Sequence, residues 1–377
     1  MNIGIEITKA HHKDGGFGVY PRKLIKNLLE IDKNNQYIVF TSKFLDELDG
    51  FSNCRQILVP SSDGIVNFLK LYFNFKKIIE KYDIDILHLL SLYGIRKAPR
   101  LTISTVFDLR HLAVSGLNER KFGKIIYKYW LPYLLKHSCH FIAISEETKK
   151  TMKMHFGISD DRITVTRLGH EIYLPDKSEE MATRISGKYF MWVGMITKRK
   201  NLEVLYRAFA QFIACHPKYK LVIAGKFLNS IVEGSHKKLI HNLNIKSSII
   251  FTGYVPDSEL YTLYKNSAAF IFPSIYEGFG IPIIEAMALG TPVITTVDGG
   301  ATKEVAGNAA LFFKRYDADE LAERMKEIIS NETLRDLLVN KGKQRAEFFS
   351  WKKTAEVTLD VYRKLTTSNN NDSAFCS

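Results

Sequence analysis

The chain is 377 residues long with a net charge of +13, which is enough length for two ordinary domains with a basic surface. No apolar stretch approaches the roughly 20 residues of a membrane-spanning helix, and the acid Glu6 interrupts the first apolar segment. We therefore expect neither a membrane span nor a secretory signal. The four cysteines lie far apart without paired spacing, which predicts reduced thiols in the cytoplasm and no metal site.

Short apolar runs alternate with helical patterns through the first half of the chain. Such runs, rich in β-branched residues and bounded by polar or turn residues, are typical of buried parallel strands. We expect strands at residues 3–7, 37–40, 84–90, 101–106, 141–144 and 163–165. Helices are expected between them, at residues 20–29 and 146–155.

The polar segment 171–187 interrupts this alternation and is predicted to link two domains. A second series of strands is expected at residues 189–193, 219–224, 249–253, 268–272, 292–295 and 310–312. Helices are expected at residues 202–215, 258–265, 281–289, 319–329, 333–348 and 351–365. The predicted organisation is an N-terminal domain over 1–175, a C-terminal domain over 176–350, a final helix over 351–366 and a disordered tail over 367–377.

Alternating strands and helices predict two doubly wound α/β domains, each with a parallel sheet covered on both faces. Open parallel sheets bind ligands at the carboxyl ends of their strands, and two such domains joined by a linker are expected to enclose a cleft there. This pattern indicates a nucleotide or phosphate ligand, but a fold does not fix a reaction.

The most informative segment, residues 273–298, reads PSIYEGFGIPIIEAMALGTPVITTVD. A strand runs into a glycine-bearing loop, and a helix then begins with Pro282 in its first turn, where proline is tolerated. Backbone N–H groups at such a helix start can hold an anion or hydroxyl groups. The carboxylates of Glu277 and Glu285 could hold the hydroxyl groups of a hexose and a ribose. On spacing alone, a surface loop followed by a glutamate favoured by the helix dipole is an equal alternative.

A second motif, GMITKRKNL at residues 194–202, lies at a strand-to-helix turn. Its adjacent cations Arg199 and Lys200 suit a diphosphate, although a solvated basic turn is the alternative. Two further turns carry weaker signals. The segment DGGFGVY at residues 14–20 fits either a ligand loop or a tight turn, and in TGYVPD at residues 252–257 we favour Asp257 as a helix N-cap over a contact with a guanine edge.

Together these segments resemble glycosyltransferase family 4, the group 1 retaining glycosyltransferases of the GT-B fold. The stretch EGFGIPIIE, from Glu277 to Glu285, matches the E-x7-E signature of the family, and AMALGTPVI continues the match. The resemblance covers nearly the whole chain. It implies two Rossmann-like doubly wound domains that face each other across a cleft, with a C-terminal helix that crosses back to the first domain.

The resemblance also implies a role for each matching residue. Glu277 contacts the donor sugar near the reacting face, and Glu285 contacts the ribose of the nucleotide. Arg199 and Lys200 match the diphosphate-binding pair and stabilise the leaving group. The remaining donor-binding positions, in the N-terminal glycine loop, the base-binding turn and the second loop, are Gly16, Val255, Gly278, Phe279, Gly280 and Ile281, with Gly18 as a further candidate.

One departure from the family concerns the strand at residues 101–106. Many members follow it with His-Asp, and their histidine helps to position the donor sugar, whereas this chain has Phe107 and Asp108. Three alternatives follow: the contact is dispensable, Asp108 or His111 replaces it, or the enzyme is weakened. His88 is interpreted as a buried structural histidine.

The activity implied by the resemblance is transfer of a hexose from a nucleoside diphosphate sugar to an acceptor hydroxyl, with retained anomeric configuration. GDP-mannose is the first expectation for the donor and a UDP-sugar the second, without a metal or other cofactor. The acceptor is expected to be a glycan or a lipid-linked glycan in surface polysaccharide or glycolipid assembly.

The positive charge is concentrated in residues 1–175, where 26 Lys and Arg face 18 Asp and Glu and so contribute +8. Segments 68–82 and 120–136 mix cations with aromatic and aliphatic residues, which suits the anionic inner face of the plasma membrane. An ordinary amphipathic helix is the alternative for each segment. A cytoplasmic protein, peripheral on that membrane, is the resulting expectation.

Three rival functions follow from the same residues. Another enzyme on this fold, such as an epimerase, a glycogen synthase-like enzyme or a phosphorylase, would share the donor site. A non-catalytic relative that binds a nucleotide sugar or a partner enzyme is favoured by Phe107. A nucleic-acid-binding protein is suggested only by charge, because no zinc knuckle, helix-turn-helix or RRM signature is present, and we expect no nucleic-acid partner.

Overall fold

The computed structural model describes residues 1–8, 16–60, 74–90, 99, 101–114, 131–171 and 185–369. The chain divides into two compact units. The first unit is Met1–Gly169 together with Ser350–Ser377, and the second unit is His170–Phe349. The boundary predicted between residues 175 and 176 falls outside the described residues.

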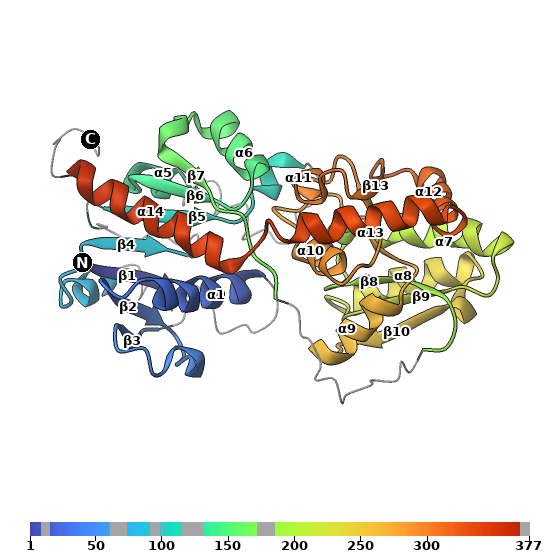
Figure 1. Ribbon diagram of the computed structural model, residues 1–377, viewed down its shortest axis with the longest axis horizontal. Coiled ribbons are helices and arrows are strands. Elements are labelled where there is room, and N and C mark those ends of the chain that lie inside the picture. Colours follow the sequence, from blue (N-terminus) through green and yellow to red (C-terminus); the bar gives the residue numbers. More distant parts are fainter. Residues whose placement is uncertain are drawn as a thin grey trace. The chain divides into compact units, whose positions relative to one another are not determined.

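The first unit is built on a seven-stranded sheet with the order β3-β2-β1-β4-β5-β6-β7 (Figure 1). Its paired strands are all parallel, so the chain winds outward from β1 in both directions. The strands are β1 Asn2–Ile7, β2 Gln36–Thr41, β3 Cys54–Leu58, β4 Ile86–Leu89, β5 Thr102–Val106, β6 His140–Ala143 and β7 Ile163–Val165. The prediction omitted the edge strand β3, because its sequence CRQIL is too polar to form an apolar run.

The helices of the first unit that the structure describes are α1 Gly16–Ile31, α3 Arg110–Ala113, α5 Leu131–His137, α6 Glu146–Phe156 and α14 Trp351–Asn369, with the short 3-10 helices η1 Asp46–Leu48 and η3 Asp160–Arg162. The C-terminal helix α14 packs against α1. Because α14 continues to Asn369, the predicted disordered tail is wrong for residues 367–369, and the rest of that tail lies outside the described residues.

A buried polar contact fastens α14 to the sheet of the first unit. The Tyr362 hydroxyl lies 2.6 Å from His88 Nδ1, and His88 Nε2 lies 2.8 Å from Thr105 Oγ1. Burial lowers the pKa of His88 to about 3, so the ring is neutral. Both ring nitrogens are satisfied, which fits the structural role expected for this histidine.

The second unit is built on a six-stranded parallel sheet with the order β10-β9-β8-β11-β12-β13. The strands are β8 Tyr189–Val193, β9 Lys220–Ala224, β10 Ile249–Gly253, β11 Ala269–Phe272, β12 Val293–Thr296 and β13 Ala310–Phe313. The helices are α7 Leu202–Cys215, α8 Ser230–Asn242, α9 Asp257–Asn266, α10 Ile281–Ala288, α11 Thr302–Ala306, α12 Ala318–Ser330 and α13 Glu332–Ala346, with the 3-10 helices η4 Lys198–Lys200 and η5 Lys246–Ser248.

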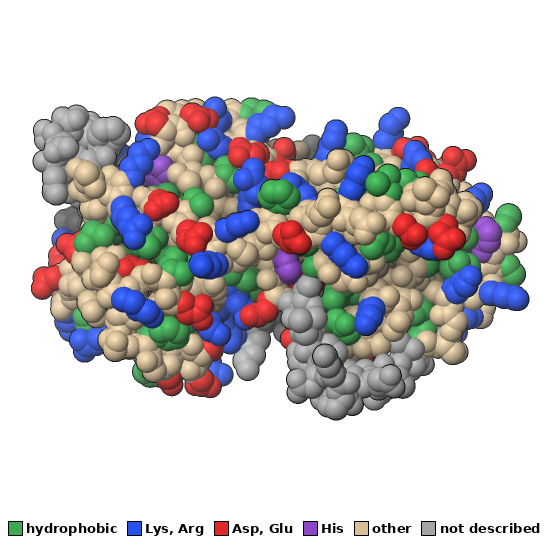
Figure 2. All heavy atoms as spheres, in the orientation of Figure 1, with side chains coloured by type: hydrophobic (Ala, Val, Ile, Leu, Met, Phe, Trp, Pro, Cys, Tyr) green, Lys and Arg blue, Asp and Glu red, His purple; other side chains and the backbone are tan. Residues whose placement is uncertain are grey.

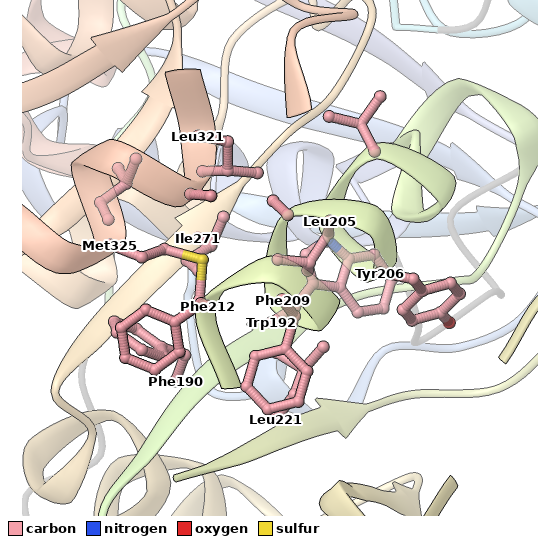
Figure 3. Close-up of a cluster of buried hydrophobic side chains, with 14 of the residues drawn as sticks. Phe190, Trp192, Leu205, Tyr206, Phe209, Phe212, Leu221, Ile271, Leu321 and Met325 are labelled. Carbon is pink, nitrogen blue, oxygen red and sulfur yellow. The ribbon is translucent and has the colours of Figure 1, made fainter. Parts of the chain in front are cut away.

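The core of the second unit lies between its sheet and the helices α7 and α12 (Figure 3). Trp192 of β8 is fully buried there, packed in one cluster with Phe209 of α7 and Met325 of α12. Burial of each such side chain stabilises the fold by about 1.5–3 kcal/mol. Both units are therefore Rossmann-like, doubly wound parallel α/β domains, and this part of the predicted fold class is confirmed.

No helix among the described residues is long and apolar enough to cross a bilayer. On the face drawn in Figure 2, Lys and Arg side chains are interspersed with Asp and Glu over both units. Of the basic and aromatic segments 68–82 and 120–136, the structure describes residues 74–82 and 131–136, where Phe75, Ile79 and Leu134 are buried in a hydrophobic core cluster of the first unit.

Candidate active site

Backbone contacts tie together the loops at the carboxyl edge of the second sheet. Isolated bridges join Ile196 to Phe227 and Gly225 to Gly253, so the loop after β9 is held to the loop after β8 and to the last residue of β10. Gly225 has φ +146°, and a Cβ there would lie 1.8 Å from the carbonyl oxygen of Gly194. Only glycine fits this crossing, and the edge is consequently a fixed platform.

The loop after β11 is fixed in the same way to its neighbours on both sides. The Ile275 N–H donates to the Arg199 carbonyl at 2.9 Å, which joins this loop to the one after β8. The Glu277 N–H donates to the Gly299 carbonyl at 2.9 Å, and the Ala301 N–H donates to the Glu277 carbonyl at 2.9 Å. The backbone of Glu277, in the loop after β11, is therefore held by two hydrogen bonds to the loop after β12.

Three charged side chains meet at this edge. Arg199 Nη1 and Lys200 Nζ both pair with Glu277 Oε1, and the lysine contact is 2.7 Å long. Their side chains are only 12–17% exposed. Burial favours the neutral acid, but the charges and hydrogen bonds of both cations outweigh it and lower the pKa of Glu277 to about 2. The carboxylate is thus ionised throughout the physiological range.

The start of α10 lies directly after this cluster. Gly280, with φ +125°, occupies the N-cap position and has no side chain to cap the helix, and Ile281 and Pro282 are its first two residues. The first-turn N–H groups of a helix without a side-chain cap can bind an anion or a hydroxyl oxygen. The predicted stretch Gly278 to Ile281 therefore joins the ion cluster to a helix N-terminus.

Glu285, also on α10, has a different environment from Glu277. The Tyr264 hydroxyl of α9 donates to its Oε2 at 3.2 Å. The pKa of Glu285 is raised to about 7, chiefly by burial; the Tyr264 hydrogen bond lowers it in part, and the charge of Asp257 adds to the increase. A ligand that donates hydroxyl hydrogens would compensate this carboxylate, and the paired hydroxyls of a ribose have that chemistry.

The turn between β10 and α9 carries two of the predicted residues. Val255 is buried there, with 8% of its surface exposed, and it follows Gly253, whose φ is +71°. The prediction that Asp257 caps α9 is wrong: Pro256 occupies the N-cap position, and no side-chain cap forms. Because the helix begins directly after the extended Pro256, Asp257 is its first residue. The negative charge of Asp257 there interacts favourably with the helix dipole.

The first unit holds the other predicted residues. Gly16 is the first residue of α1, and Gly18 lies buried in its first turn. Asp108 accepts a hydrogen bond from the Arg110 N–H at 3.3 Å and pairs with the side chain of that arginine. His111 lies in α3, but its side chain is outside the described residues.

Phe107 occupies the position where many family members carry histidine. Its side chain is buried, and its ring meets Tyr20 edge to face, with the centroids 5.0 Å apart. The phenylalanine is thus an integral part of the packing of the first unit.

Tyr264 was not predicted as a site residue from the sequence. It is an aromatic residue on the buried face of an amphipathic helix, so its pattern could not be distinguished from that of an ordinary core residue. Only its position, opposite a carboxylate on another helix, reveals a polar role. Across the described ranges, no three His, Cys, Asp or Glu side chains gather in a group that could hold a metal ion.

The two doubly wound units, with the ion cluster and helix start at the carboxyl edge of the second sheet, define the GT-B class of proteins. The family model "Glycosyl transferases group 1" matches residues 177–345, and "Glycosyltransferase Family 4" matches residues 14–171. The chain belongs to glycosyltransferase family 4, the group 1 glycosyltransferases.

Known proteins extend this comparison. O-antigen chain mannosyltransferase B of Escherichia coli is 27% identical over 232 residues, which cover 59% of this chain and 60% of that protein. The capsular polysaccharide biosynthesis glycosyltransferase CapM of Staphylococcus aureus is 30% identical over 265 residues, which cover 66% of each. The chain thus spans less than two thirds of the length of these relatives. HepE of Anabaena, solved in complex with UDP-glucose, has the same fold, with a TM-score of 0.75 at 15% identity over 97% of this chain and 100% of that chain.

Proposed function

We propose that this protein is a hexosyltransferase that moves a hexose from a nucleoside diphosphate sugar to a hydroxyl of a glycan or lipid-linked acceptor, with retained anomeric configuration. The observation that carries the proposal is the buried cluster of Arg199, Lys200 and Glu277 beside the start of α10. It offers two cations, one ionised carboxylate and a set of helix N–H groups at one edge of a parallel sheet.

Each part of the cluster suits one part of such a donor. Guanidinium and ammonium groups bind diphosphate oxygens, so Arg199 and Lys200 turn from Glu277 toward the diphosphate. Glu277, then freed of part of its pairing, accepts hydrogen bonds from the hydroxyls of the sugar. The N–H groups of Phe279, Gly280 and Ile281 contact sugar and phosphate.

The transfer step needs no covalent bond to the protein. The bond between the anomeric carbon and the diphosphate oxygen breaks, and the acceptor oxygen attacks the same face of the sugar. The departing diphosphate oxygen takes the proton of the acceptor hydroxyl, so charge and protons balance. The protein contributes position and charge stabilisation, and the two cations neutralise the leaving group in the place that a metal ion would otherwise take.

The identity of donor and acceptor is proposed from the relatives. The name of the Escherichia coli relative states a mannosyltransferase, which supports GDP-mannose as the first candidate. The UDP-glucose complex of HepE supports a UDP-sugar as the second. Both curated relatives are named for an O-antigen chain or for capsular polysaccharide biosynthesis, which supports a glycan or lipid-linked glycan as the acceptor.

The membrane proposal has a separate test. Segments 68–82 and 120–136 carry cations among apolar residues, a composition that adsorbs to anionic lipid surfaces. The protein should float with vesicles that contain phosphatidylglycerol and stay in solution with neutral vesicles. Failure to bind either vesicle would contradict peripheral attachment.

A second candidate, a non-catalytic relative, is favoured by Phe107, which replaces a hydrogen-bonding histidine of the family and packs against Tyr20. A thermal-shift panel of GDP-, UDP- and ADP-sugars, with Glu285→Ala as the control, tests the donor site for both candidates. A ligand that binds only the folded state raises its melting temperature, by an amount equivalent to about 2.7 kcal/mol at a hundred times Kd. We expect sugars of one nucleotide class to raise the melting temperature of the wild type, and we expect Glu285→Ala to lose this increase. No shift with any donor would contradict the transferase and favour a non-catalytic relative that binds a partner enzyme, and a shift without turnover would favour a non-catalytic relative that binds a nucleotide sugar.

A further inference from the structure

Tyr264 makes a polar contact that the proposed mechanism does not use. It lies on α9, with 1% of its surface exposed, and its hydroxyl donates to Glu285 Oε2 at 3.2 Å. A tyrosine that served only to fill space would be as well replaced by phenylalanine. The hydroxyl joins α9 to α10 at the one carboxylate that the proposal assigns to the ribose.

The hydroxyl is held in one place because Tyr264 is anchored at its other end. Its carbonyl oxygen accepts from Thr291 Oγ1 at 2.8 Å, a residue just beyond the end of α10. Its ring meets Phe270 of β11 edge to face, with the centroids 5.3 Å apart. These contacts leave the ring of Tyr264 little freedom to turn.

Glu277 is paired with two cations, whereas the side chain of Glu285 accepts a hydrogen bond from Tyr264 of α9. The charge that acts on Glu285 is negative and comes from Asp257, also on α9. A carboxylate offers about four acceptor positions on its two oxygens, and Tyr264 occupies one of them, on Oε2. The hydrogen bond fixes the rotation of the carboxylate about its last bond. A fixed carboxylate can accept from two neighbouring hydroxyls at once.

We propose that Tyr264 is a positioning residue that orients the Glu285 carboxylate toward the 2′- and 3′-hydroxyls of a ribose, so that the protein selects ribonucleotides over deoxyribonucleotides. This inference rests on the proposed function, because it assumes a nucleoside diphosphate at this edge of the sheet. The raised pKa of Glu285 supports it: a carboxylate so poorly compensated gains most from hydroxyl donors.

The test is calorimetric titration of the full chain with GDP and UDP and with their 2′-deoxy and 3′-deoxy forms. We expect the wild type to bind the better ribonucleotide at least about tenfold more tightly than its deoxy forms. Tyr264→Phe should weaken ribonucleotide binding about tenfold and deoxynucleotide binding by less than about twofold, so the discrimination shrinks. The donor KM should rise by a similar factor while kcat changes little.

Tyr189→Phe is the matched control. It removes another buried tyrosine hydroxyl from the same region, and Tyr189 acts on the backbone of Leu263 rather than on Glu285. This variant should melt at a lower temperature and keep the full discrimination. A second readout is pH: wild-type affinity should fall as the pH drops through about 7, because Glu285 gains a proton, and in Tyr264→Phe the fall should begin at a higher pH.

The possible results separate the inference from the proposed function. Equal weakening of ribo- and deoxyribonucleotide binding in Tyr264→Phe, or undiminished discrimination, would overturn the positioning role while nucleotide binding itself stands. Absence of nucleotide binding by the folded wild type would overturn the proposed function and the inference together.

Discussion

At the scale of single residues, the two glutamates of the E-x7-E segment show how environment divides one side-chain type into two kinds of acid. Glu277 is surrounded by Arg199 and Lys200, and the pKa of its carboxyl is lowered to about 2. Glu285, eight residues on, faces a tyrosine and an aspartate, and burial raises the pKa of its carboxyl to about 7. We propose that the first acid supplies a permanent charge to the reaction site and that the protonation of the second responds to the ligand.

Glu277→Gln should lower both stability and transfer. The folded-state pKa lies below the unfolded value near 4.5, so the ionised group stabilises the fold above pH 4.5, and this stabilisation is lost as pH falls toward 2. Removing the charge leaves Arg199 and Lys200 buried beside each other, at a cost of about 3 kcal/mol at pH 7. Thermal melting at pH 7 measures this cost, and an unchanged melting temperature would contradict the ion cluster.

Glu285→Gln should have the opposite effect on stability. Here the folded-state pKa of about 7 exceeds the unfolded value of 4.5, so the group destabilises the fold progressively as pH rises from 4.5 through 7. Glutamine keeps the shape and still accepts from Tyr264, so the variant should gain up to about 3 kcal/mol at pH 8 and nothing below pH 4. Melting curves at both pH values test this, and a lower melting temperature at pH 8 would contradict it.

At the scale of elements, the carboxyl edge of the second sheet depends on glycines that bring loop backbones together. Gly225→Ala should cost more than about 3 kcal/mol, because its Cβ would meet the Gly194 carbonyl at 1.8 Å. Gly253→Ala is the matched control at the same edge: it also has positive φ but nothing lies within 4 Å of its Cβ, so it should cost only about 1 kcal/mol. If denaturant unfolding showed the same loss of stability in Gly225→Ala and Gly253→Ala, the close contact between the backbones of Gly225 and Gly194 would be contradicted.

The burial of each element explains whether it could be predicted from the sequence. Strands such as β8 and β11 are buried along their length, so they appear in the sequence as continuous apolar runs. The helix α8 was missed because SIVEGSHKKLIHN is polar around most of its circumference and buries mainly His236 and Ile240. Its start is set by the Asn229 side chain, which accepts from the Val232 N–H.

Residues of the candidate site could be predicted where they belong to a sequence motif. Residues that reach the site only through tertiary contacts could not. Glu277 is far in sequence from the adjacent pair Arg199 and Lys200, and the motifs marked all three, but the pairing of both cations with Glu277 appears only in the structure. Tyr264 had no motif, because a tyrosine on an apolar helix face gives no sign of the carboxylate opposite it. The prediction of Asp257 as the N-cap of α9 was wrong for a similar reason, because the exact first residue of a helix is not fixed by the sequence pattern. Pro256 occupies the N-cap position, and the helix begins at Asp257.

At the scale of the whole molecule, the last helix belongs to the unit formed by the beginning of the chain, and the buried pair of His88 and Tyr362 attaches it. Tyr362→Phe leaves the buried Nδ1 of His88 without this partner and should lower the free energy of unfolding of the first unit by about 1–3 kcal/mol. Thr366→Val is the control, because it removes a part-buried hydroxyl from the same helix. Calorimetry should show a lower transition temperature for Tyr362→Phe and not for Thr366→Val. Equal transition temperatures for the two variants would contradict this attachment.

We propose that the second unit holds a nucleoside diphosphate sugar and that the protein transfers its hexose. The most direct measurement supplies the purified protein with GDP-mannose or UDP-glucose and lipid-linked glycan acceptors, and determines the anomeric configuration of any product by NMR. We predict a product with the configuration of the donor, formed from one of the two nucleotides, and a loss of at least about 100-fold in Glu277→Gln. A product with inverted configuration, or an unchanged rate in the folded Glu277→Gln variant, would contradict this proposal.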